Sequence, residues 1–159
     1  MKRKLWFLLF IASLTSFSCK KSKTDTPAVT LSQWTFNGVT YKVTDAWYES
    51  SLSYLEASDN PGVVGGGNFV RVVFGAFTKP AASTSLTVVQ DGLQSDPSNC
   101  GIEVGDYYGA TYYSTGKAGD KVTLSVSSSG KLTTSFSDIT ISADGGTTTK
   151  TVSGTLVEQ

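Results

Sequence analysis

Apolar and polar residues alternate along most of the chain after residue 30, most regularly in the C-terminal half. In KVTLSVS, residues 121–127, Val122, Leu124 and Val126 fall on one face of an extended strand and hydroxyl residues on the other. An SSG turn leads into KLTTSFSDITIS, and a second turn, ADGG, precedes TTTKTVSGTLVE. The pattern predicts three antiparallel strands in a meander with one face exposed to solvent.

Further strands are predicted in the N-terminal half. Asn37 and Gly38 lie between β-forming residues, and both positions of a two-residue type I′ turn require positive φ, so we expect a hairpin there. Its second strand could continue as far as Tyr48. Residues 69–77, FVRVVFGAF, are apolar at nearly every position and predict a central strand covered on both faces.

The strand pattern predicts an all-β domain. No run of ten or more residues shows helical periodicity, and nine or ten short strands follow one another at close spacing. We expect an antiparallel β-sandwich, Ig-like or jelly-roll-like, and the alternative is a small β-barrel. Residues 32–159 are enough for a single domain that buries roughly two-thirds of its unfolded surface.

The first 18 residues have the features of a secretory signal peptide. Lys2, Arg3 and Lys4 precede the apolar run LWFLLFIASL at residues 5–14. That run is about half the roughly 20 residues that a membrane-spanning helix needs. We therefore expect export of the protein and removal of residues 1–18.

The end of this signal fits two kinds of cleavage site. Ser16 and Ser18, with Phe17 between them, match the ordinary small-x-small site. The same residues with Cys19 resemble a bacterial lipobox, in which the cysteine becomes diacylated. Ser16 stands where that motif usually has Leu, and Phe17 where it has a small residue. Because two lysines and a polar segment follow at once, we expect Cys19 to carry the lipid, palmitate or a similar acyl chain.

The segment after the cysteine predicts a tether. Residues 20–30, KKSKTDTPAVT, are polar and show no apolar periodicity. Fully extended they reach roughly 35–40 Å, and two acyl chains anchor a protein stably where a single chain is marginal. We therefore expect a signal peptide at 1–18, a lipidated cysteine and flexible tether at 19–31, and a β-domain at 32–159.

The polar tail after CKK is followed along the chain by the segments WTFNGVTY, YYSTG, KVTLSVSSSGKLTTSFSDI and TVSGTLVE. In these segments the chain is similar to small, mostly uncharacterised β-domains of Bacteroidetes lipoproteins. Over about residues 33–158 the resemblance consists of strand and turn patterning, and it implies no activity. It implies an all-β fold and a lipid anchor in the outer membrane. A lysine directly after the cysteine resembles the outer-membrane-sorted class, and the periplasmic and cell-surface faces both stay open.

Charge and composition exclude several classes of function. Six of the thirteen basic residues precede residue 24, so the predicted domain is mildly acidic, and no basic patch indicates nucleic-acid binding. The absence of histidine excludes Ser-His-Asp triads, Cys-His nucleophiles and histidine-bound metals. We expect no cofactor, no metal and no enzyme activity. Cys100 is expected to be a buried small hydrophobe, and the alternative is an intermolecular disulfide.

A hydrolase that works through carboxylates is the less favoured catalytic alternative. Such chemistry needs two carboxyl groups held roughly 5–9.5 Å apart in a cleft. The candidate acids are Glu49, Glu56, Glu103 and Asp106.

The tyrosine-rich segment DYYGATYYSTG is the candidate ligand site. If it is extended, Tyr107 and Tyr113 share one face of the strand, and Tyr108 and Tyr112 share the other. The outward pair would offer a stacking surface for sugar rings, and the alternative is cross-strand aromatic packing. We expect a lipid-anchored, non-catalytic binding module for an unknown ligand, with a glycan as one candidate. The alternative is a structural or assembly component that contacts an envelope protein at the outer membrane.

Overall fold

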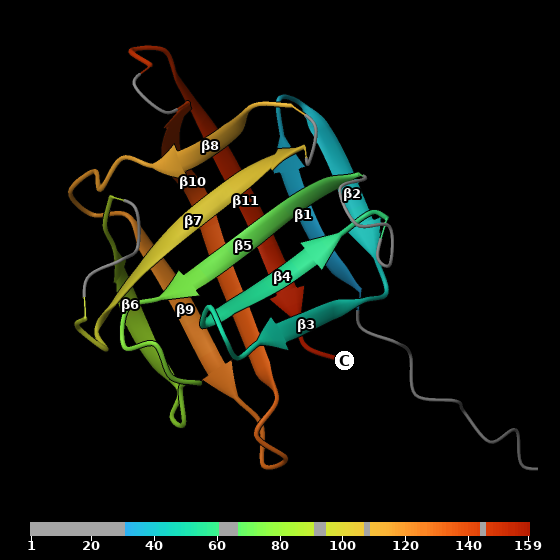
Figure 1. Ribbon diagram of the computed structural model, residues 1–159, viewed down its shortest axis with the longest axis vertical. Helices are drawn as coiled ribbons and strands as arrows, with labels where there is room; N and C mark the ends of the chain where they lie inside the picture. Colours follow the sequence, from blue (N-terminus) through green and yellow to red (C-terminus); the bar gives the residue numbers. More distant parts are fainter. Residues whose placement is uncertain (1–30, 61–66, 91–94, 107–108, 144–145) are drawn as a thin grey trace, which may run out of the picture.

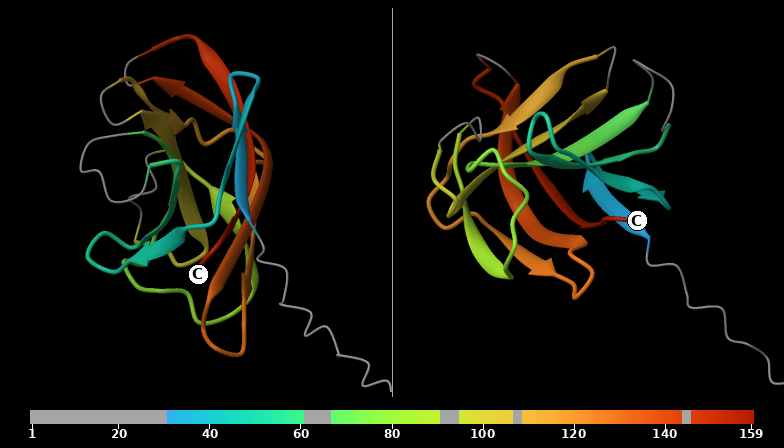
Figure 2. Two further views of the ribbon diagram at one scale, coloured as in Figure 1. Left: turned by 90° about the vertical axis from the view of Figure 1, so that its right-hand side faces the viewer. Right: turned by 60° about the horizontal axis from the view of Figure 1, so that its bottom comes forward.

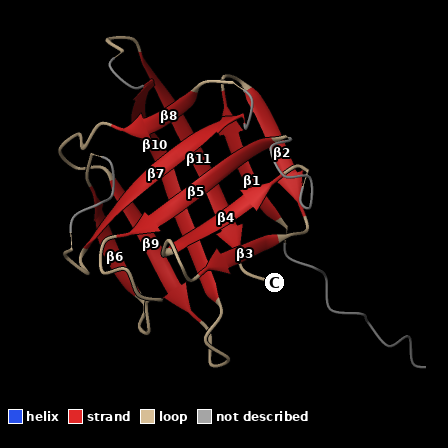
Figure 3. Cartoon of the chain, viewed as in Figure 1, coloured by secondary structure: helices blue, strands red, loops and turns tan. Residues whose placement is uncertain are grey.

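The computed structural model describes residues 31–60, 67–90, 95–106, 109–143 and 146–159 (Figure 1). These residues form β-strands joined by turns and loops, and they contain no helix (Figure 3). The strands are β1 (Ser32–Phe36), β2 (Val39–Val43), β3 (Ala46–Glu49), β4 (Tyr54–Ser58), β5 (Asn68–Phe74), β6 (Thr84–Val88), β7 (Asn99–Asp106), β8 (Thr111–Ser114), β9 (Lys121–Val126), β10 (Leu132–Ala143) and β11 (Thr149–Val157). The predicted all-β class is confirmed. Within the described ranges there is accordingly no helix long and apolar enough to cross a bilayer.

The strands form one mixed sheet that folds over itself into two layers. Their order is β2-β1-β11-β10-β9-β6-β7-β5-β4-β3, and β8 pairs with both β10 and β7. The β2-β1-β11-β10-β9 part forms one layer, and the β7-β5-β4-β3 part crosses in front of it (Figures 1 and 2). Strands β2 and β3 end the order and do not pair with each other, so the sheet is not a closed barrel. The architecture is sandwich-like, as predicted.

The structure departs from the prediction in four details. The described residues form eleven strands rather than nine or ten, and β6 pairs with β7 in parallel, so the sheet is not wholly antiparallel. The strand after the first hairpin ends at Val43, because the next strand, β3, pairs with β4 in the other layer. The central strand β5 ends at Phe74, and Phe77 is exposed with positive φ.

The core lies between the two layers and follows the predicted alternation. Val122 and Leu124 of β9 are buried, whereas Thr123 is exposed. The opposite layer contributes the apolar residues of β5, which is covered along most of its length as predicted. In the β1–β2 hairpin Asn37 and Gly38 both have positive φ, which confirms the predicted turn.

Strand β10 changes partner halfway along its length. Its first half pairs with β9 and its second half with β8. The register with β11 shifts between Phe136 and Ile139, and Asp138 takes a φ of 53° in this bulge. The Asp120 carboxylate accepts the Thr140 N–H at 3.0 Å, where β10 has no strand partner on that side. The bulge therefore marks the place where the sheet divides.

Candidate functional site

The structure describes part of the predicted tyrosine site. Strand β8 is extended, so Tyr112 and Tyr113 lie on opposite faces, as predicted. Tyr107 and Tyr108 lie outside the described residues, as does Cys19. The two described tyrosines therefore do not share a surface.

Tyr112 faces the core and holds a lysine in place. Its ring packs against Phe36 at 5.1 Å between centroids, and its hydroxyl accepts a hydrogen bond from Lys150 Nζ at 2.8 Å. The same ammonium lies 4.3 Å from the centroid of the Tyr112 ring and 5.2 Å from that of Phe36. Cation–π attraction and the hydrogen bond together orient Lys150. Tyr112 therefore packs against Phe36 of β1 and Lys150 of β11, and its role in ligand binding stays a prediction.

Tyr113 faces outward beside a cluster centred on Arg71, which we call the Arg71 cluster (Tyr54, Glu56, Phe69, Arg71 and Glu103). Its members come from β4, β5 and β7, and Tyr113 is the cross-strand partner of Glu103. Arg71 Nε lies 2.5 Å from Glu56 Oε2, and Nη1 lies 3.4 Å from Glu103 Oε2. The guanidinium carbon is 4.7 Å from the centroid of the Tyr54 ring and 4.4 Å from that of Phe69.

The Arg71 cluster is satisfied within the protein. Glu56 is 1% exposed and its charge is paired with Arg71, as a buried carboxylate requires. Burial raises the pKa of Tyr54, which keeps the phenol neutral. Both carboxylates of the cluster contact one guanidinium rather than an open cleft. We therefore assign to this cluster the role of joining three strands.

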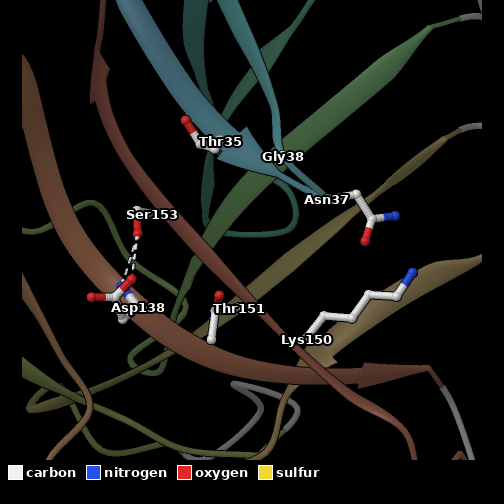
Figure 4. A pocket seen from close by; sticks show the side chains of 7 residues that line it. All are labelled: Thr35, Asn37, Gly38, Asp138, Lys150, Thr151 and Ser153. Atoms are coloured by element: carbon white, nitrogen blue, oxygen red, sulfur yellow. Dashed lines mark hydrogen bonds between the residues drawn. The ribbon is translucent and has the colours of Figure 1, made fainter.

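A cavity of about 340 Å³ lies on the other layer, and we call it the Asp138 pocket (Figure 4). Three segments meet there, namely the β1–β2 turn, the β10 bulge and the first half of β11. The lining residues are Thr35, Asn37, Gly38, Asp138, Lys150, Thr151 and Ser153. The type I′ turn presents Asn37 to the pocket, and the bulge presents Asp138.

Asp138 is held in place by its neighbours. Its backbone N–H donates to Ser153 Oγ at 2.9 Å, and Ser153 Oγ lies 3.2 Å from Asp138 Oδ1, to which it donates. Ser137 Oγ donates to the other carboxylate oxygen at 3.2 Å. Figure 4 shows Asp138 and Ser153 together on one side, while Lys150 extends toward the side of Asn37. Aspartate tolerates the left-handed backbone better than most residues, so it suits this bulge.

The lining suits a polar ligand without net charge. Its described residues carry one carboxylate, one ammonium group that already donates to the Tyr112 hydroxyl, one side-chain amide and three hydroxyl groups. Carboxylates accept, ammonium groups donate, and amides and hydroxyls do both. Among the described residues that line the pocket there is a single carboxylate, whereas glycoside hydrolysis by the usual route needs two. In the described part of the chain no group of three or more His, Cys, Asp or Glu residues is placed to hold a metal.

Sequence reasoning missed this pocket because its two halves are about a hundred residues apart. The turn at Asn37 was predicted, but its partner across the sheet was not. One signal for the bulge is present in the sequence: Phe136 and Ile139 are both buried, although alternation would put residues three apart on opposite faces. The two polar residues between them, Ser137 and Asp138, form the bulge that shifts the alternation of buried and exposed positions.

Cys100 carries no reactive chemistry. The thiol is free and fully buried, and burial raises its pKa to about 12. A protonated, inaccessible thiol is neither a nucleophile nor a metal ligand. The prediction of a buried small hydrophobe is confirmed.

Comparisons of the chain with protein-family models, with curated proteins and with solved structures gave no match.

Proposed function

We propose that the chain is a lipid-anchored envelope lipoprotein whose β-domain binds a glycan without catalysing a reaction. The observation that carries the binding role is the Asp138 pocket. It is a hollow lined by hydrogen-bonding groups of both kinds, with balanced charge. Hydroxyl groups of a sugar donate and accept in the same way, so they match such a lining.

The strained backbone at Asp138 supports a binding role for the pocket. A non-glycine residue with φ of 53° inside a strand costs free energy, and such residues concentrate at functional sites. Bulges also redirect side chains next to such sites. Here the bulge places the Asp138 carboxylate in the pocket lining, where it accepts a hydrogen bond from Ser153 Oγ.

The anchor belongs to the same proposal. Its support is the sequence SFSCKK around Cys19 and the polar segment at 20–30. An anchored domain on a tether can capture a polymer close to the membrane without diffusing away. The membrane, through the anchor, and a glycan are thus the proposed partners.

An assembly role is the second candidate, because the sheet has two edge strands. Strand β2 has five residues and carries Lys42, and charged residues on short edges oppose pairing with another chain. On β3 the Ala46 carbonyl accepts the N–H of Gln159 at 3.0 Å, so part of that edge is covered. Both features favour glycan binding over assembly by strand addition.

Affinity electrophoresis of the mature lipoprotein in detergent tests the proposal. The gels contain soluble starch, laminarin, galactomannan or xylan, and we expect at least one of them to retard the protein. Asp138→Asn and Lys150→Gln should abolish the retardation. The matched controls are Asp45→Asn and Lys131→Gln, since both residues are exposed and lie outside the pocket lining. Migration that no polysaccharide changes, or equal retardation of pocket and control variants, would overturn the proposal.

A further inference from the structure

Two further hollows adjoin the Asp138 pocket on the same face of the molecule. A hollow of about 200 Å³ shares Thr35 and Ser153 with the pocket. A third hollow, of about 430 Å³, shares Phe136, Gly154 and Thr155 with the second. We call this continuous series the cross-strand groove.

The strand register explains the floor of the groove. Trp34, Gly154 and Phe136 are successive cross-strand partners on β1, β11 and β10. The Trp34 and Phe136 side chains belong to the core. The floor of the groove is therefore the backbone of this row of residues. Gly154 has no side chain on either side of the sheet.

Two rows of polar residues form the walls. On one side lie successive cross-strand partners from β1 to β9, namely Gln33, Thr155, Ser135 and Thr123. On the other side Thr40, Thr35 and Ser153 are partners across β2, β1 and β11, and this row ends at the bulge with Asp138. Hydroxyl pairs occur in both walls, with 3.2 Å between Ser135 and Thr155 and 2.8 Å between Thr35 and Thr40.

We propose that the cross-strand groove binds a linear, uncharged polysaccharide chain laid across the strands, with one sugar unit in the Asp138 pocket. This inference rests on the proposed function and assigns the ligand to polymers rather than to single sugars. From β1 to β9 the groove crosses three inter-strand spacings of ~4.8 Å, roughly 14 Å in all, which exceeds one sugar ring.

The charges along the groove favour a neutral chain. Asp138 and Lys150 line the first hollow, and Asp120 and Lys121 line the third. Two acids and two lysines leave no net charge to attract an anionic polymer. The Asp120 carboxylate already accepts the Thr140 N–H, which reduces what it can offer to a ligand.

Isothermal titration calorimetry with oligosaccharides of increasing length tests the inference. The probes are the malto-, laminari-, manno- or xylo-oligosaccharides of the polysaccharide that retards the protein. We expect the affinity to rise about tenfold or more from the monosaccharide to the hexasaccharide, because longer chains form more hydrogen bonds in the groove. Thr123→Arg should remove this gain and leave monosaccharide binding unchanged, since Thr123 lines only the hollow far from the pocket.

Ser125→Arg is the matched control, because Ser125 is exposed on the same face of β9 and lies outside the linings of the three hollows. Ser135→Arg, with Thr133→Arg as its control, repeats the test on β10. Thermal melts establish that each variant is folded.

The outcomes separate the two proposals. The groove proposal is overturned if the affinity does not rise with chain length beyond one sugar unit, or if Thr123→Arg and Ser125→Arg bind the hexasaccharide equally well. Either result leaves the proposal for the pocket intact. Failure of every saccharide to bind overturns both.

Discussion

Gly154 allows two aromatic side chains to pack directly behind β11. A Cβ atom at this position would lie 2.9 Å from the Gln33 carbonyl oxygen, 2.9 Å from Phe136 Cζ and 3.0 Å from Trp34 Cβ. Real Cβ atoms rarely approach backbone this closely, so the sheet or the core must shift. We expect Gly154→Ala to lower the free energy of unfolding by about 1–3 kcal/mol, as measured by urea denaturation.

The neighbouring Thr155→Ala is the control for this prediction. Thr155 faces the groove rather than the core, so the substitution should change the free energy of unfolding by no more than about 0.5 kcal/mol. An unfolding midpoint for Gly154→Ala equal to that of the unmodified protein would contradict the close packing.

The buried thiol of Cys100 makes stability depend on pH. Unfolded, the thiol loses its proton near its ordinary pKa of 9.0, whereas burial raises the pKa in the folded protein to about 12. Between these values the unfolded chain binds fewer protons than the folded one. The free energy of unfolding should therefore fall as pH rises from about 9 to about 12, by at most about 1.4 kcal/mol per pH unit from this group.

The contribution of Cys100 is isolated by comparison with Cys100→Ala. All other ionisable groups are the same in both proteins, so the difference between the two pH profiles reports the thiol alone. We expect the stability of the Cys100→Ala variant, measured by urea denaturation, to fall less steeply above pH 9. Parallel profiles would show that the thiol ionises freely in the folded state.

Strand β10 depends on Asp120 at the place where the sheet divides. With Asp120→Ala the Thr140 N–H loses its acceptor in a partly buried position. An unsatisfied buried donor costs about 1–3 kcal/mol. We expect a loss of stability of that size and faster hydrogen exchange at the Thr140 amide, followed by NMR.

The exposed neighbour Lys121 supplies the comparison, because Lys121→Ala removes a charge beside Asp120 without removing an acceptor. Unchanged exchange at Thr140 in Asp120→Ala would mean that water replaces the carboxylate.

The elements that local chemistry determines were predicted from the sequence. The Asn37-Gly38 hairpin followed from the φ requirement of its turn, and the meander β9-β10-β11 from alternation and two short turns. The elements that depend on distant pairing were not. Strand β3 leaves the first hairpin for the other layer, and β8 pairs with two strands at once, and neither pairing leaves a local pattern.

The candidate site shows the same division. Tyrosines were predicted as the site because aromatic residues stand out in a sequence, yet Tyr112 packs inward and Tyr113 lies beside an internally paired cluster. The Asp138 pocket consists of common polar residues. They can be recognised as a site only when the strand register places the Asn37 turn near the β10 bulge. Hydroxyl residues on an exposed sheet face carry no signal of their own.

At the scale of the whole molecule the two outer faces differ in character. The outer face of β4, β5 and β7 carries the Arg71 cluster, whose charges pair with one another. The β1-β11-β10-β9 face carries the cross-strand groove, whose walls are mostly hydroxyl groups and whose charges are balanced. A ligand on the first face would have to break ion pairs, whereas a ligand on the second would compete only with hydrogen bonds such as those between Thr35 and Thr40 and between Asp138 and Ser153. The second face is therefore the one from which binding is expected.

The proposed lipid anchor would hold that face close to the membrane, and Cys19 is the residue to test. In cells supplied with labelled palmitate we expect the unmodified protein to be labelled and recovered in the detergent-extracted membrane fraction, because two acyl chains bind a bilayer stably. Cys19→Ser should lose the label and leave the membrane fraction. Cys100→Ser removes the other cysteine of the chain and should keep both properties. If Cys19→Ser stays in the membrane fraction, the protein is held there by something other than a lipid on this cysteine.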